Sequence, residues 1–231
     1  MRGRIVAIVP AAGIGRRFGK DENKSFVDLG RKPLLLWALG TLGSMPEVDE
    51  IIPVLRKSDM EPALELFERY NITKIKRIAP GGKERQESVF HGLGLVKDSD
   101  SVILVHDGAR PLITPHVVRN AVGALSGCDG VVVGVPVKDT IKEVAEGGVL
   151  RTLNRQSLWA VQTPQIFPFG TVYGAYERAM RESFYSTDDS ALVERYGGRI
   201  KVVMGSYRNI KITTPEDLGI AEAFLREEGG A

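Results

Sequence analysis

Short apolar runs alternate with longer amphipathic stretches from the N-terminus to about residue 137. The runs are rich in valine and isoleucine and span residues 5–9, 51–55, 72–79, 101–107 and 129–137. Near-continuous apolar runs are typical of strands covered on both faces, as in parallel sheets. Between them the spacing predicts helices over about 33–42, 58–70, 84–96 and 115–126. This alternation predicts an α/β, doubly wound sheet with right-handed crossovers, in which ligands bind at the carboxyl ends of the strands.

The pattern changes over residues 138–160, where apolar and polar positions alternate around Gly147 and Gly148. This predicts a β-hairpin, in which IKEVA and VLRTLN pair across a turn at EGG. Because an isolated hairpin is at best marginally stable, we expect an arm used in dimerisation, or a hairpin packed on its own domain. Beyond it the spacing predicts helices over about 169–183 and 188–197, strands near 200–204 and 207–213, and a last helix. Ser58, Thr114 and Thr214 are expected to cap the helices that follow them.

Composition narrows the class of protein. The 231 residues are 43% hydrophobic and 26% charged, which is typical of a soluble globular protein, and we expect one domain over 1–231. Lys plus Arg exceed Asp plus Glu by only 31 to 29, which argues against nucleic acid as a partner. The single cysteine, Cys128, excludes a disulfide framework and a cysteine-based zinc site. No run is long enough for a membrane span or a signal peptide, so we expect a cytoplasmic protein.

A glycine loop, PAAGIGRRFGK at residues 10–20, follows the first apolar run. It does not fit a P-loop, because Gly13 and Gly19 are six positions apart and Asp21 stands where Ser or Thr is required. It does not fit a dinucleotide fold either, because Phe18 occupies the place of the third glycine. Glycines allow backbone N–H groups to approach anionic oxygens, and four basic residues follow: Arg16, Arg17, Lys20 and Lys24. The loop therefore predicts a cradle for a triphosphate, against the alternative of a solvated basic loop.

Polar residues follow other predicted strands. In GGKERQES, at 81–88, the glycines suit close approach of a base or ribose, although a plain turn has the same pattern. In HDGARP, at 106–111, Asp107 is a candidate Mg²⁺ ligand, because Mg²⁺ is held by one or two carboxylates together with substrate phosphates. For His106 we expect a structural hydrogen bond, and Arg110 could bind a phosphate or hold its loop. Lys211 lies in the alternating run 208–213, where a core-facing lysine would need an anion and an edge lysine would face solvent.

Several segments together resemble one family, the 2-C-methyl-D-erythritol 4-phosphate cytidylyltransferases of the non-mevalonate isoprenoid pathway. The segments are PAAGIGRRF, Lys24, GGKERQES, HDGARP, PVKDT, QTPQIF, STDDSALVE and NIKIT, in order from about residue 5 to 225. The resemblance implies a Rossmann-like, glycosyltransferase-A-like nucleotidyltransferase fold with a mostly parallel sheet and helices on both faces. It also implies Mg²⁺ dependence and a homodimer that exchanges the arm at 138–160. The implied reaction joins CTP and the methylerythritol phosphate, with release of pyrophosphate.

The resemblance also implies roles for particular residues. Those expected to hold the triphosphate and the α-phosphate are Arg17, Lys24 and Lys211. Those expected to contact CTP are Pro10, Ala11, Ala12, Gly13, Gly82, Lys83, Ser88, Asp107 and Gly108, with Asp107 also at the metal. Those expected at the methylerythritol phosphate are Arg110, Thr140, Thr163, Thr187 and, from the partner's arm, Arg155. Arg16, Lys20 and the Asp188–Asp189 pair receive no firm role.

The chemistry implied by the resemblance agrees with the residues themselves. Three scattered histidines and a distant Cys128 offer no nucleophile–base pair, and phosphoryl transfer between two phosphates requires none. The nearest rival is the same transfer to another polyol phosphate, such as ribitol 5-phosphate. A glycosyltransferase would carry a second acid near Asp107, which HDGARP lacks. A nucleotide sensor without catalytic activity would not need so many cations.

Overall fold

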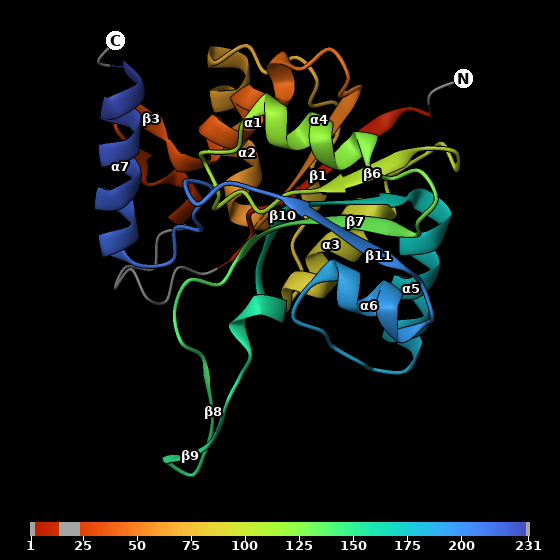
Figure 1. Ribbon diagram of the computed structural model, residues 1–231. Coiled ribbons are helices and arrows are strands. Elements are labelled where there is room, and N and C mark those ends of the chain that lie inside the picture. The colour runs from red at the N-terminus through yellow and green to blue at the C-terminus, as the bar shows by residue number, and fades with distance from the viewer. Residues whose placement is uncertain (1–2, 14–23, 230–231) are drawn as a thin grey trace.

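The computed structural model describes residues 3–13 and 24–229, and its centre is a seven-stranded sheet (Figure 1). The strand order is β11 (Ile200–Met204), β7 (Gly130–Pro136), β10 (Trp159–Pro168), β6 (Val102–Val105), β1 (Ile5–Pro10), β4 (Glu50–Leu55) and β5 (Ala79–Pro80). Strand β10 runs antiparallel to both neighbours, and all the other pairings are parallel. The predicted mostly parallel α/β sheet is therefore confirmed.

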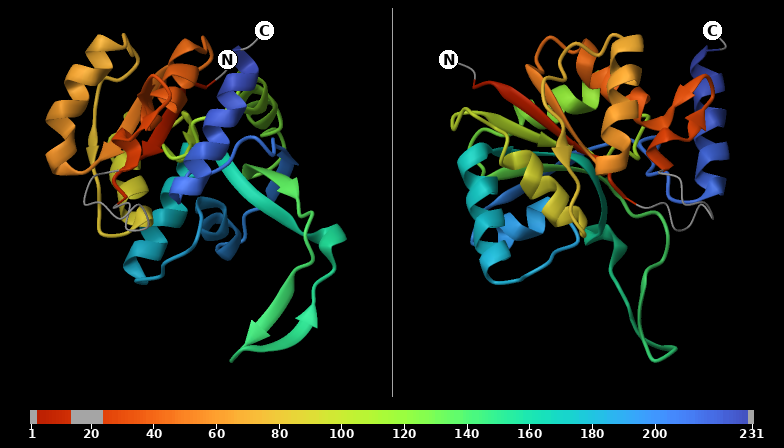
Figure 2. Two further views of the ribbon diagram at one scale, coloured as in Figure 1. Left: turned by 90° about the vertical axis from the view of Figure 1, so that its left-hand side faces the viewer. Right: turned by 180° about the vertical axis from the view of Figure 1, so that it is seen from behind.

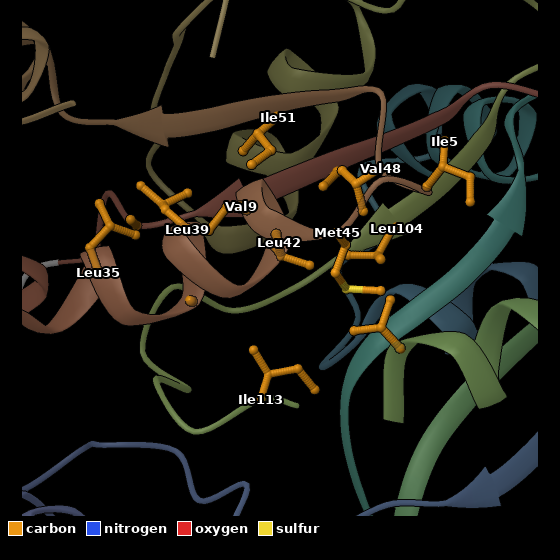
Figure 3. Packing of buried hydrophobic residues seen from close by; sticks show 14 of the residues in the cluster. Ile5, Val9, Leu35, Leu39, Leu42, Met45, Val48, Ile51, Leu104 and Ile113 are labelled. Carbon is orange, nitrogen blue, oxygen red and sulfur yellow. The ribbon is translucent and has the colours of Figure 1, made fainter. Parts of the chain in front are cut away.

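Helices cover both faces of this sheet. One face packs against α1 (Leu34–Ser44), α2 (Lys57–Arg69) and α4 (Pro115–Gly123), and the other against α3 (Arg85–Leu93), α5 (Phe169–Arg181) and α6 (Asp189–Arg195). Alternation along β1 divides its side chains, so that Val9 lies in the first cluster (Figure 3) and Ile8 in the second. Both are fully buried, because a strand with a helix layer on each side has no solvent-facing positions.

A smaller layer lies beside the carboxyl ends of the strands. The two-stranded hairpin of β2 (Asp28–Leu29) and β3 (Lys32–Pro33) follows the short 3₁₀ helix η2 (Lys24–Phe26). The hairpin packs near the last helix, α7 (Pro215–Gly229), as Figure 2 shows. Leu29, Leu34 and Ile212 are fully buried in a cluster of their own here, which fixes the segment that carries Lys211.

The hairpin predicted over 138–160 projects away from the body of the molecule (Figures 1 and 2). It consists of β8 (Lys142–Ala145) and β9 (Gly148–Thr152), followed by the 3₁₀ helix η3 (Arg155–Ser157). The turn forms at the expected EGG, where Glu146 and Gly147 take positive φ angles of 49° and 80°. The arm therefore forms as predicted, and it does not lie on its own domain.

The chain departs from the predicted elements in several places. Residues 72–79 are mostly irregular, with a single bridge between Ile75 and Ile51 before β5 begins at Ala79, and the Arg77 side chain binds Glu50 and the Leu95 carbonyl. Residues 207–213 form a loop held by the Ala109 carbonyl, which accepts from Ile212 N at 2.8 Å. Strand β10 was not predicted. It contains the QTPQIF segment and lies in the centre of the sheet, between β7 and β6.

Smaller features follow the sequence in part. Thr114 caps α4 as expected, since its hydroxyl accepts from Val117 N, and Thr214 accepts in the same way from Asp217 N. Ser58 does not cap α2, which begins one residue earlier at Lys57. Cys128 is half-buried, with its thiol directed at carbonyl oxygens of the preceding turn. Within residues 3–13 and 24–229, no helix combines the length and apolarity that a membrane crossing requires.

Candidate functional site

A pocket of about 370 Å³ lies at the carboxyl ends of β1, β4, β5 and β6, where the fold class predicts ligand binding. Its volume is within the range of small-molecule sites. It brings together nine of the residues expected around a nucleotide: Pro10, Ala11, Ala12, Gly13, Gly82, Lys83, Ser88, Asp107 and Lys211. Segments that are distant in the sequence therefore meet in one cavity.

Backbone hydrogen bonds hold two glycine-containing loops against the end of β4. Ala11 N donates to the Val54 carbonyl at 2.8 Å, and Gly81 N donates to the Leu55 carbonyl at 2.7 Å. A Cβ on Gly81 would lie 2.3 Å from the Cβ of Ala12, so only glycine allows the loops to come this close. The Ser88 hydroxyl accepts from Gly82 N and donates to the Glu84 carbonyl, both at 3.0 Å. Ser88 thus shapes the loop in addition to lining the pocket.

Asp107 is buried between two cations. Its Oδ2 lies 2.7 Å from Lys211 Nζ, and its Oδ1 accepts from Arg85 Nε at 3.0 Å. Burial by itself would raise the pKa of Asp107, but the charges of Arg85 and Lys211 outweigh burial and hold that pKa far below its usual range. A carboxylate that is ionised near neutral pH and a lysine ammonium therefore face the pocket side by side.

Arg85 received no role from the sequence, and it is the centre of the charge network behind Asp107. Its two terminal nitrogens bind the carboxylate oxygens of fully buried Asp189, each at 2.8 Å. The Tyr176 hydroxyl also donates to Asp189. Burial alone would lower the pKa of Arg85, but the carboxylates of Asp189 and Asp107 raise it well above its usual value. The bidentate pair joins the start of α3 to the start of α6, and so fixes the direction of the Arg85 side chain.

His106 forms the structural hydrogen bonds expected of it. Its Nε2 faces the Arg110 carbonyl at 3.0 Å, which only accepts, so Nε2 carries the proton and Nδ1 accepts from the Thr163 hydroxyl at 3.0 Å. The Thr163 oxygen in turn accepts from Asp107 N at 3.0 Å. Burial lowers the pKa of His106 to about 4, so the ring is neutral near pH 7. This chain of bonds positions the backbone at Asp107.

The buried histidine predicts a pH dependence of folding. The unfolded chain binds a proton on His106 below about pH 6.5, whereas the folded chain does not bind it until about pH 4. Stability therefore rises with pH in this window, and we expect His106 to remove up to about 3 kcal/mol from the free energy of unfolding as pH falls across it. In urea titrations at several pH values, His106→Gln should flatten this part of the profile. The exposed control His116→Gln should keep the wild-type slope, and an unchanged slope in His106→Gln would contradict the assignment.

Other residues expected at the site lie around the pocket without lining it. Gly108 is buried behind the loop, with its N–H on the Pro10 carbonyl at 3.1 Å, and Arg110 donates to the Asn209 carbonyl at 2.7 Å. Thr140 and Arg155 are exposed in the arm, and Thr187 is exposed just before α6. Arg17 and the basic residues near it lie outside the described residues, as does the side chain of Lys24, whose backbone begins η2.

Comparison with known proteins gives one consistent result. The family model described as 2-C-methyl-D-erythritol 4-phosphate cytidylyltransferase matches residues 5–227. Curated relatives carry the same name. The protein from Geotalea uraniireducens is 46% identical over 226 residues, covering 96% of this chain and 97% of that protein. The protein from Clostridioides difficile is 43% identical over 222 residues, covering 96% and 93%.

Solved structures agree with the sequence comparison. The crystal structure of 4-diphosphocytidyl-2C-methyl-D-erythritol synthase from Anaerococcus prevotii superposes with a TM-score of 0.86 at 35% identity, covering 97% of this chain and 96% of that one. The 2-C-methyl-D-erythritol 4-phosphate cytidylyltransferase of Thermus thermophilus gives a TM-score of 0.78 at 28% identity, covering 95% and 98%. The likeness therefore extends over nearly the full length of both chains in each comparison.

Proposed function

The chain belongs to the 2-C-methyl-D-erythritol 4-phosphate cytidylyltransferase family, and from this membership we propose the part that each residue around the pocket plays. It transfers CMP from CTP to 2-C-methyl-D-erythritol 4-phosphate, giving 4-diphosphocytidyl-2-C-methyl-D-erythritol and pyrophosphate. A phosphate oxygen of the acceptor attacks the α-phosphorus of CTP in line. The new P–O bond forms as the bond to the β-phosphate breaks, and pyrophosphate leaves with that electron pair. The acceptor phosphate is already ionised near neutral pH, so no protein nucleophile or strong base is needed.

The observation that carries the assignment of roles is the pairing of Lys211 with Asp107 beside the glycine loops. Lys211 Nζ lines the pocket 2.7 Å from Asp107 Oδ2, so it is already oriented before substrate binds. We assign Lys211 to the α-phosphate, where it stabilises the negative charge that spreads over the oxygens during transfer. Arg17 and Lys24 are assigned to the β- and γ-phosphates. The backbone of residues 10–13 and 82–83 borders the rest of the nucleotide, together with Ser88 and Gly108.

Asp107 fits the divalent cation that the family implies. Each oxygen of a carboxylate has two lone pairs, so Asp107 retains acceptor capacity beside Arg85 and Lys211. Mg²⁺ is often held by one or two carboxylates together with substrate phosphates, and Asp107 supplies a carboxylate that lines the pocket. Bound in this way, Mg²⁺ would neutralise triphosphate charge. Asp107 itself is held ready by its two cationic neighbours and by the hydrogen bond from its N–H to Thr163.

The acceptor is assigned to the side of the pocket near Arg110. Arg110 is half-buried, and its Nε has no hydrogen-bond partner within the part of the chain that the structure describes. That unmatched donor suits a phosphate oxygen of methylerythritol phosphate. Thr163 stands behind Arg110, with its hydroxyl hydrogen already given to His106. Thr187, Thr140 and Arg155 would complete the acceptor site from more exposed positions.

The arm is assigned to a homodimer, within which the chain acts as one catalytic domain. Val144, Val149 and Leu150 on its strands are 54%, 61% and 63% exposed, which is unusual for apolar side chains gathered on one hairpin. Trp159 and Val161 continue the exposed apolar surface into β10. A second copy of the chain would cover these residues. It would also carry Thr140 and Arg155 of one protomer to the acceptor site of the other.

Arm exchange predicts complementation between two defective variants. Arg155→Ala should raise the KM for methylerythritol phosphate, because it removes a cation from the acceptor site. Lys211→Ala should inactivate its own pocket. When the two variants are co-expressed with different affinity tags and the mixed dimer is isolated, one pocket regains both residues and activity should return to about half of wild type. The working pocket should also regain the wild-type KM for methylerythritol phosphate. A mixed dimer that keeps the raised KM of Arg155→Ala would show that Arg155 acts within its own chain.

The reaction is tested most directly with purified protein. We expect pyrophosphate release when the protein is incubated with CTP, Mg²⁺ and 2-C-methyl-D-erythritol 4-phosphate. Ribitol 5-phosphate and a reaction without acceptor serve as comparisons, and Lys211→Ala serves as the inactive protein. Release with ribitol 5-phosphate and none with methylerythritol phosphate would overturn the acceptor.

A further inference from the structure

Arg56 lies in the nucleotide pocket, and neither the sequence nor the family resemblance assigned it a part. It follows β4 directly and stands at the N-terminal boundary of α2. Strand β4 lies between β1 and β5 in the sheet, and its last residues accept hydrogen bonds from both glycine-containing loops. Arg56 therefore lines the pocket together with residues 10–13, Gly82 and Lys83.

The guanidinium of Arg56 has unused hydrogen-bond donors. Its Nε and Nη2 are buried, and neither has a hydrogen-bond partner among the described residues. Arg56 forms an ion pair with Asp59, but Asp59 Oδ2 is 3.6 Å from Nε, which is too long for a hydrogen bond. Buried donors without acceptors are costly, because their hydration is lost without replacement. A ligand with acceptor atoms in this part of the pocket would remove that cost.

The position of Arg56 in the sheet identifies which part of the nucleotide it meets. Asp107 and Lys211 stand at the end of β6, and in the proposed function they mark the phosphate end of the pocket. Arg56 stands two strands away, at β4, beside the Gly81–Gly82 pair. Gly82 lines the pocket without a side chain, and its N–H donates to the Ser88 hydroxyl at 3.0 Å. A glycine in this wall, with the phosphates at the far end of the pocket, leaves room for the base of CTP.

We propose that Arg56 is a further nucleotide-binding residue, which donates hydrogen bonds to the acceptor edge of the cytosine base. A guanidinium has only donors, and cytosine offers O2 and N3 as adjacent acceptors. Uracil carries a hydrogen on N3, so the same contact favours CTP over UTP, because a donor facing a donor is left unpaired. This inference rests on the proposed function and adds a specificity determinant to the same pocket.

Binding measurements with fragments of the nucleotide test the proposal. By calorimetry, Arg56→Ala should weaken CMP and CTP about equally, roughly 10-fold or more, and leave the binding of inorganic triphosphate unchanged. In the same variant, the ratio of CTP affinity to UTP affinity should be smaller than in the wild-type protein. Unchanged CMP affinity, or a loss shared by inorganic triphosphate, would overturn the contact with the base.

Two control variants separate binding from a structural role at the start of α2. Lys57→Ala removes the adjacent exposed cation and should leave CMP affinity unchanged, which excludes a general charge effect. Asp59→Asn removes the ion pair with Arg56 and should also leave CMP affinity near wild type. If Asp59→Asn instead reproduces the loss, with the same change in melting temperature, Arg56 acts through the helix and the proposal is wrong. Failure of the proposed function is distinct, because wild-type protein would then release no pyrophosphate from CTP.

Discussion

Lys211→Ala is expected to lower kcat/KM for pyrophosphate release by about 10²–10³, with folding intact. The lysine ammonium lies in the pocket, and its ion pair with Asp107 Oδ2 at 2.7 Å holds it in place before CTP binds. A charge that needs no reorientation during transfer lowers the barrier more than one recruited from solvent. Folding should survive, because Arg85 still pairs with Asp107 in the variant. Steady-state kinetics with CTP and methylerythritol phosphate measure the loss, and circular dichroism measures the fold.

Conservative and distant substitutions make this prediction specific. Lys211→Arg keeps the charge with a different shape and should lose less activity than Lys211→Ala. Lys97→Ala removes an exposed lysine outside the pocket and should keep wild-type kinetics. Near wild-type kcat/KM in Lys211→Ala would contradict the role of Lys211 at the α-phosphate, independently of the roles proposed for the other residues.

Much of the fold could be predicted because its signals are local. Buried parallel strands read as apolar runs, so β1, β4, β6 and β7 were located correctly, and the helices between them follow from their spacing. The short segment at 72–79 misled the prediction because its alternation of Ile with Lys and Arg imitates a strand. In the fold, only an isolated bridge at Ile75 pairs with β4 before β5 begins, and Arg77 forms an ion pair with buried Glu50. Strand β10 could not be foreseen, since its position between β7 and β6 depends on contacts with residues distant in sequence.

The candidate site divides in a similar way. Residues at strand ends, such as Gly82, Asp107 and the loop 10–13, could be predicted because the topology itself brings strand ends together. Lys211 was expected in a strand, with a core-facing position beside an anion and a solvent-facing position both left open. It lies in a loop, where its ammonium is 2.7 Å from the carboxylate of Asp107.

Arg85 and Arg56 show what sequence reasoning misses. Both lie inside motifs or strand ends that were recognised, but their partners are set by packing across the molecule. Asp189 is 104 positions from Arg85, and no spacing rule connects them. The available signals were an arginine three positions after Gly82 and an acidic pair in STDDSALVE. They belong together because α3 and α6 pack on the same face of the sheet, which no local pattern shows.

The Arg85–Asp189 pair carries the largest stability prediction. Arg85→Met should lower the free energy of unfolding by about 3–5 kcal/mol, because fully buried Asp189 would lose its cation while remaining out of water. Activity should also fall, since Asp107 loses one of the two charges that hold it. Urea denaturation at neutral pH measures the first effect. Adding Asp189→Asn to Arg85→Met should recover part of the lost stability, because the uncompensated charge is then gone and Asn can still accept from Tyr176.

An exposed ion pair elsewhere on the same face provides the matched control. Arg195 and Glu182 lie 3.5 Å apart with side chains 45% and 44% exposed, so Arg195→Met should cost less than about 1 kcal/mol. Both substitutions remove an arginine from an ion pair on the α3, α5 and α6 side of the sheet. The difference between their losses of unfolding free energy therefore reports the effect of burying the ion pair. Equal losses in Arg85→Met and Arg195→Met would contradict a buried clamp. A double variant no more stable than Arg85→Met would mean that the uncompensated charge of Asp189 is not the source of the lost stability.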